Sequence, residues 1–167
     1  MPITRAELLD TLDSVHGRTW RTVACIAEDD LEWSMAPGRF TTGDIVRHLA
    51  TIERWMYAES VQGRPSRYAG CGRELANGLS DVVALYDRLH QESRAIFASL
   101  TDADLLARSM TPAGVSITTW KWLRAMFEHE AHHRGQLYLM LGLRGRAVPP
   151  IYGLTSEELI VRAAQHT

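Results

Sequence analysis

The length, composition and charge of this chain exclude several classes of protein. Its 167 residues suit one folded domain, residues 1–167, and 46% hydrophobic with 23% charged residues is typical of a globular protein. The formal net charge of −2, without a basic stripe, argues against nucleic-acid binding. We expect a cytoplasmic protein without membrane contact, because no apolar signal core opens the chain and no uncharged apolar run reaches roughly 18 residues.

The first half of the chain contains two predicted helices. The first spans about residues 4–27, where Thr4 and Glu7 fit a capping box and apolar side chains recur at steps of three and four. The segment WSMAPGRFTT interrupts this pattern, and a second helix is expected from residue 41 or 42 to about residue 60. A Gly- and Arg-rich connection over residues 61–78 follows, which is long for a link between neighbouring helices.

The second half contains two more long helices, predicted over about residues 79–100 and 119–143. The segment TDADLLARSMTPAGVSITT connects them. Thr155 and Glu158 fit another capping box, which predicts a short last helix. Because no segment shows a convincing strand alternation, we predict an all-α protein, a four-helix bundle with a short extra C-terminal helix. Cys25 and Cys71 lie far apart and are expected to be reduced thiols.

Three histidines fall on apolar faces of the second and fourth predicted helices. Positions four apart share a helix face, so His129 and His133 lie on one stripe, and His48 lies between Ile45 and Ile52 on another. A satisfied core histidine is the plainer explanation for any one of them, but burying three unpartnered imidazoles is costly. A shared metal ion satisfies all three. The pattern therefore predicts one divalent ion per chain, and Zn²⁺, Ni²⁺ and Fe²⁺ all suit nitrogen ligands.

The run HEAHH also spells H-E-x-x-H, the pattern of zinc peptidases, in which Glu130 would be the general base. The longer form of that motif fails at Gln136 and Leu139, and no clear strand is predicted to pair with an extended substrate. A peptidase is therefore the less favoured alternative. His132 points about 100° away from His133, so we expect it at the edge of the site. Glu130 and His132 are candidates for moving a proton, whereas His16, His90 and His166 have no partner at chelating spacing.

Two motifs resemble those of a known family. The run HEAHHRGQLYLMLGLRG resembles the signature of the DinB/YfiT-like superfamily, and FTTGDIVRHLATIERW resembles its first-histidine motif. LEWSMAPGRF and TPAGVSITT also lie where the family places similar segments, so the resemblance covers essentially the whole chain. It implies a four-helix bundle that forms a homodimer and holds a divalent metal, Zn²⁺ or Ni²⁺ first. Carried over by position, the family's ligands fall on His48, His129 and His133.

The resemblance also implies a metal-dependent enzyme that acts on a small-molecule substrate. Some relatives are transferases or isomerases that use a low-molecular-weight thiol such as bacillithiol or mycothiol. Thiol transfer to an electrophile is therefore the first hypothesis and simple hydrolysis the second. The rival from a different class is a non-catalytic, stress-associated protein in which the metal ties two helices together.

The letters RGQ after the second ligand allow two interpretations. Arg134 is a candidate for binding an anionic substrate, and the alternative is a structural ion pair with Glu53. Gly135 costs helix stability, by up to about 1 kcal/mol, and is expected to permit a close helix approach. Gln136 is expected to hydrogen-bond beside a metal ligand or between helices.

Overall fold

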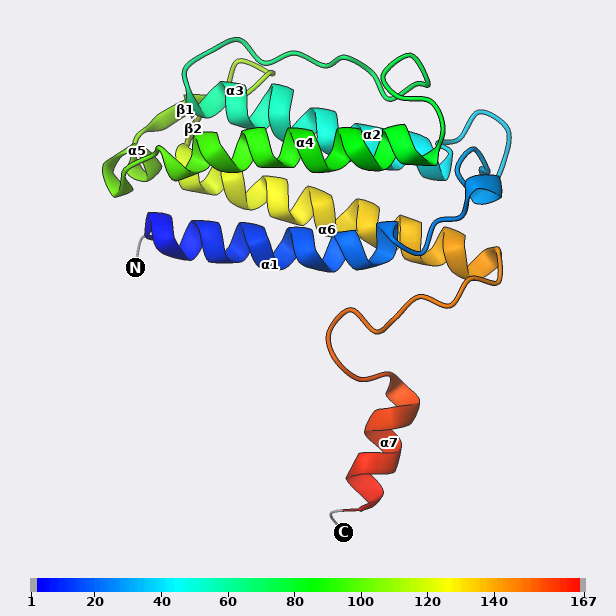
Figure 1. The fold of residues 1–167 in the computed structure, drawn as a ribbon. Helices are drawn as coiled ribbons and strands as arrows, with labels where there is room; N and C mark the ends of the chain where they lie inside the picture. Colours follow the sequence, from blue (N-terminus) through cyan, green and yellow to red (C-terminus); the bar gives the residue numbers. More distant parts are fainter. Residues whose placement is uncertain (1–2, 166–167) are drawn as a thin grey trace.

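Helices dominate the computed structural model, which describes residues 3–165. The long helices are α1 (Arg5–Val23), α2 (Thr42–Ile52), α4 (Leu79–Ala98) and α6 (Thr119–Leu143). Figure 1 shows them side by side along a common direction, which confirms the predicted bundle. The short α7 (Ser156–Ala164) follows a connecting segment and projects away from the bundle, as Figure 1 shows.

Capping boxes define where several helices begin. The Thr4 hydroxyl accepts from the amide of Glu7 and the Glu7 carboxylate accepts from the amide of Thr4, as predicted. Thr155 and Glu158 form the same arrangement at the start of α7. The far end of α1 differs from the prediction, because the helix stops at Val23 and the chain turns so that Ile26 enters the core.

The second predicted helix contains a wider turn near its middle. After α2 the chain forms a π-helical segment, η2 (Glu53–Tyr57), and then resumes as α3 (Ala58–Val61). Such π segments interrupt α-helices frequently at functional sites. Here the segment begins five residues after His48, and its first residue, Glu53, is buried in the bundle.

The connection before α6 holds a small hairpin that the sequence did not predict. After α5 (Asp102–Leu106), strand β1 (Arg108–Met110) pairs antiparallel with β2 (Ser116–Thr118). The expectation of a chain without strands was wrong here, since strands of three residues are too short to show an alternating pattern. The buried Ser109 hydroxyl lies 2.8 Å from that of Thr119, which ties the hairpin to the start of α6.

The bundle core divides into two apolar clusters along its length. One contains Ile45, Leu49, Leu89, Leu137 and Met140, and the other contains Leu8, Leu12, Phe97, Leu123 and Met126. Among the described residues, no helix has both the length and the apolar character that crossing a membrane requires. Both cysteines, Cys25 and Cys71, are free thiols.

Candidate metal centre

The three predicted ligands meet between α2 and α6. The Nε2 atom of His129 lies 3.1 Å from the Nε2 atom of His48 and 3.1 Å from that of His133. One ring nitrogen from each residue falls within 4.8 Å of the other two. The chain thus brings together histidines that are eighty-one residues apart in the sequence.

This arrangement fits a divalent metal ion. A metal–nitrogen bond of about 2.1 Å allows two nitrogens on one ion to lie at most about 4.2 Å apart. The two separations from His129 Nε2, each 3.1 Å, fall within that limit. Three imidazoles also form an incomplete coordination shell, which leaves room for water or a substrate atom. The donor set does not select among Zn²⁺, Ni²⁺ and Fe²⁺.

Hydrogen bonds on the other ring nitrogens orient two of the ligands. His133 Nδ1 lies 2.7 Å from Gln136 Oε1, which is an acceptor, so this nitrogen carries the proton and Nε2 keeps its lone pair. His48 Nδ1 lies 3.2 Å from the Tyr68 hydroxyl. Gln136 was predicted beside a ligand, whereas Tyr68 was not identified. Tyr68 lies in the connection between α3 and α4, where no periodic pattern marks it.

The site favours neutral imidazoles. Burial lowers the pKa of His48 to about 4, and the nearby His133 lowers it too. Burial also lowers the pKa of His129 to about 4, together with His133, His48 and His132. Burial lowers the pKa of His133, although the hydrogen bond that His133 donates to Gln136 acts in the opposite direction. Neutral imidazole is the form that binds metal, so these three side chains are ready to bind at neutral pH.

A hollow of about 490 Å³ lies beside the histidines. Its lining combines the loop before α2 with one face of α6 and consists of Met35, Ala36, Gly38, Arg39, Phe40, Ile45, Gln136 and Met140. The Phe40 ring lies 5.8 Å from the His48 ring, and Gln136 contacts His133. The sequence interpretation did not include this wall. Met35 and Phe40 could have indicated this wall, because they are apolar residues in a loop directly before the helix that carries His48.

A buried arginine fixes the base of that loop. The Arg47 side chain is 0% exposed and donates to Glu32, to Asp44 and to the carbonyl oxygen of Ala76. Glu32 lies in the loop and Asp44 in the first turn of α2, so Arg47 joins the loop to the helix. Since His48 is the next residue, the same short stretch positions both a ligand and the wall of the hollow.

The proton-transfer candidates lie in different surroundings. Glu130 is only 4% exposed, and its carboxylate accepts a hydrogen bond from the Tyr86 hydroxyl of α4. Burial and the charge of Glu53 raise the pKa of Glu130 to about 7. His132 is exposed, and its Nε2 atom lies 3.2 Å from Gln136 Nε2. His132 therefore lies at the edge of the site, as expected, one hydrogen bond away from a residue that orients His133.

The predicted ion pair between Arg134 and Glu53 and the predicted close helix approach at Gly135 were both wrong. The buried Arg134 donates to the Val15 carbonyl oxygen, the Thr19 hydroxyl and the Tyr152 hydroxyl, not to Glu53. The Arg134 side chain extends toward α1. It does so because consecutive residues of an α-helix point about 100° apart, so Arg134 faces a different helix from His133. Nothing lies within 4 Å of a Cβ atom built at Gly135, so no close helix approach requires this glycine within the described part of the chain.

A second polar cluster lies in the core outside the metal centre. His90 Nδ1 lies 3.1 Å from the Glu53 carboxylate, and both side chains are buried. Burial by itself would lower the pKa of His90, but the hydrogen bond and charge of Glu53 raise it overall. The His16 ring stacks on His90 with ring centroids 3.4 Å apart. His16 and His90 thus have partners in the core, while His166 lies outside the described residues.

Comparisons with known proteins agree with this fold. Residues 6–137 match the family model of the DinB superfamily. A DinB-like protein from Bacillus cereus superposes with a TM-score of 0.78 at 18% identity, covering 90% of this chain and 99% of the other. A DinB-like protein from Bacillus subtilis gives 0.70 at 20% identity, with 86% and 95% coverage. No curated protein matches the sequence. With the family match over most of its length, the chain belongs to the DinB superfamily.

Proposed function

We propose that this protein is a metal-dependent enzyme that acts on a small molecule, with transfer of a low-molecular-weight thiol to an electrophile as the reaction. The observation that carries the proposal is the convergence of three imidazole nitrogens next to an open, mostly apolar hollow. A site that served only to join two helices would need no such hollow. Three protein ligands are also typical of catalytic metal sites, whereas structural sites usually have four.

The residues of the chain have separate tasks in this proposal. His48, His129 and His133 hold the ion, while Tyr68 and Gln136 keep two of the rings oriented. Met35, Phe40 and Met140 give the substrate an apolar surface that excludes water. A divalent ion lowers the pKa of a bound thiol or water, so that the nucleophile is available at neutral pH.

In the transfer itself, the thiolate sulfur forms a bond to an electrophilic carbon. The bond from that carbon to its leaving group breaks, and the leaving group departs with the electron pair. The thiol proton passes to a base, and His132 at the edge of the site is the candidate that solvent can reach. Water in place of the thiol would give the hydrolytic alternative.

The environment of Glu130 does not favour the peptidase alternative. A general base must come within hydrogen-bonding distance of the nucleophile, directly or through one water. The Glu130 carboxylate is buried and bonded to Tyr86, and burial disfavours its charged form. The polar groups that act on this carboxylate come from α1, α4 and η2, not from the three metal ligands.

The test is a turnover assay on natively purified protein with its metal content measured. We expect close to one divalent ion per chain and transfer of a thiol, bacillithiol or mycothiol among those screened, to an electrophilic acceptor. His48→Ala is the matched variant, because it removes a ligand and should lose both metal and turnover. If no thiol or hydrolytic turnover appears and metal removal instead melts the fold, the metal is structural and the non-catalytic class is correct.

A further inference from the structure

The helix α7 exposes an apolar side to solvent. All nine of its residues are exposed, including Leu159 at 54% and Ile160 at 70%. At about 100° per residue, Leu159, Ile160 and Ala163 fall on one side of the helix, while Val161 falls on the opposite side. Helices shorter than about 12 residues are marginal in water unless an apolar face is packed. The amphipathic α7 therefore requires a surface to cover its apolar side.

The connecting segment orients α7 away from its own bundle. The Tyr152 hydroxyl accepts a hydrogen bond from Arg134, and the ring lies beneath the Arg18 guanidinium. Arg21 donates to the carbonyl oxygen of Ile151. These contacts attach residues 151–152 to α1 and α6, and α7 then leaves the bundle, as Figure 1 shows. The family match ends at residue 137, so this whole arm lies beyond it.

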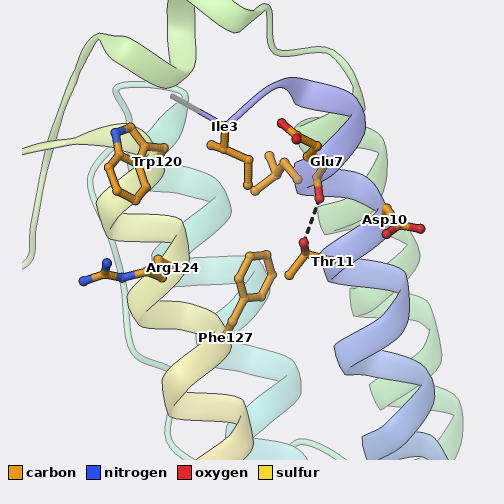
Figure 2. Close-up of a pocket in the computed structure, with 8 residues that line it drawn as sticks. Ile3, Glu7, Asp10, Thr11, Trp120, Arg124 and Phe127 are labelled. Atoms are coloured by element: carbon orange, nitrogen blue, oxygen red, sulfur yellow. Dashed lines mark hydrogen bonds between the residues drawn. The ribbon is translucent and has the colours of Figure 1, made fainter. Parts of the chain in front are cut away.

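A groove lies between the first turns of α1 and those of α6. It encloses about 470 Å³ and is lined by Ile3, Glu7, Leu8, Asp10, Thr11, Trp120, Arg124 and Phe127. Figure 2 shows Thr11 and Phe127 pointing toward each other across it. The lining residues run from Ile3, just before α1, to Thr11 and from Trp120 to Phe127 on α6, and the eight positions on α6 correspond to roughly 12 Å of helix. The nine residues of α7 span about 13 Å at the same rise.

The charges along the groove match those along α7. The α1 wall carries Glu7 and Asp10, and the α6 wall carries Arg124. On α7, Arg162 flanks the apolar side next to Leu159, and Glu157 flanks the other edge next to Ile160. With the apolar side of α7 facing the groove, Arg162 can lie along the acidic wall and Glu157 along the wall of Arg124.

We propose that α7 of one chain docks in the α1–α6 groove of a second copy of the same chain. A two-fold arrangement then places each α7 in the other chain's groove, which gives a closed dimer with two identical contacts. The occupant is a second copy because the groove is charged on both walls as α7 requires and because α7 points away from its own bundle. This interface is separate from the hollow beside the metal centre.

The first test is the mass of the full chain in solution, measured by light scattering after size exclusion. Wild-type protein should have twice the 18.8 kDa of one chain, and Ile160→Glu should reduce this mass by half. Val161→Glu is the matched control, because Val161 is similarly exposed, at 57%, but lies on the opposite side of α7. That variant should remain a dimer. A wild-type monomer, or a dimer that persists in Ile160→Glu, would overturn the proposal.

The second test identifies what α7 occupies. Thr11→Trp should fill the groove and give a monomer, yet mixing it with Ile160→Glu should restore a dimer with one intact contact. If Thr11→Trp fails to fold, Asp10→Arg replaces it, because Asp10 is exposed and reversal should repel Arg162. Adding Arg162→Asp to that variant should restore the dimer. A mixture that stays monomeric, or binding of wild-type monomer to anionic phospholipid vesicles that Ile160→Glu abolishes, would contradict the second copy as partner.

Discussion

Two clusters of polar side chains lie inside the same bundle, and they differ in whether their hydrogen-bond donors and acceptors are paired. In the cluster formed by Glu53, His90, Glu130 and Tyr86, acceptors and donors face one another, and Glu53 raises the pKa of His90. In the cluster of His48, His129 and His133, like nitrogens face one another, and burial lowers the pKa values.

This difference separates a structural cluster from a candidate metal site. The carboxylate–imidazole pair is complete with the atoms of the chain, so its contribution is to the stability of the bundle. Three facing nitrogens cannot all be hydrogen-bonded to one another, because a neutral imidazole has only one N–H to donate. A cation would supply what this second cluster lacks. The two clusters thus differ in partner chemistry and also in burial, since His48 and His129 are only half-buried.

The largest expected effect is the loss of the metal from a ligand variant. His129→Ala should reduce the metal content from close to one ion per chain to near zero, because two imidazoles hold a divalent ion much more weakly than three. His132→Ala on the same helix is the control and should keep the ion, since His132 lies at the edge of the site. Elemental analysis after dialysis measures both. Full metal content in His129→Ala would place the ion elsewhere.

The next largest effect is a loss of stability when the buried Glu53–His90 pair is broken. Glu53→Ala leaves the buried His90 without its carboxylate, and removing one partner of a buried pair typically costs about 3–5 kcal/mol. The free energy of unfolding in urea should fall by roughly that amount. Arg88→Ala is the comparison, because the Arg88–Glu92 pair is exposed and such pairs contribute less than about 1 kcal/mol. Equal losses in the two variants would contradict the structural role of Glu53.

A smaller effect is expected for a residue that orients a ligand. Tyr68→Phe removes the hydroxyl beside His48 Nδ1, and loss of such a partner typically weakens metal binding by about 10- to 100-fold. Tyr138→Phe is the control, because the Tyr138 hydroxyl donates to the carbonyl oxygen of Val148 and not to a histidine of the site. Competition with a chelator gives both affinities. An unchanged affinity in Tyr68→Phe would show that packing alone orients His48.

The smallest net effect is the pH dependence of stability in metal-free protein, because the clusters act in opposite directions. His129, with its pKa lowered from 6.5 to about 4, contributes stability that is lost as pH falls through that window. Glu130, with its pKa raised from 4.5 to about 7, contributes stability that is lost as pH rises between those values. His90, whose pKa is raised above 6.5, likewise loses its contribution as pH rises through that raised value.

Single variants should separate these contributions in urea unfolding at several pH values. Relative to wild type, His129→Leu should gain stability as pH falls from 6.5 toward 4, because its protonation no longer favours the unfolded chain. Glu130→Gln should gain stability relative to wild type as pH rises from 4.5 to 7. Parallel pH profiles for wild type and both variants would contradict these assignments.

The sequence by itself determined the long helices and the three histidines that meet between α2 and α6. The spacing of His129 and His133 places both on one face of α6, and the apolar neighbours of His48 place it on the inner face of α2. Helical periodicity is a local property, so the boundaries of α6 were predicted as residues 119–143 and observed there. The capping boxes at Thr4 and Thr155 are local in the same way.

Only the tertiary structure decided which residues complete the site and which face the core. Tyr68 reaches His48 from a loop without any pattern, and Phe40 joins the wall of the hollow because Arg47 anchors that loop. Glu130 and Arg134 flank the metal motif in sequence, yet their side chains point to Tyr86 and Tyr152. A one-residue step rotates a side chain by about 100°, and what it then meets depends on the packing of other helices.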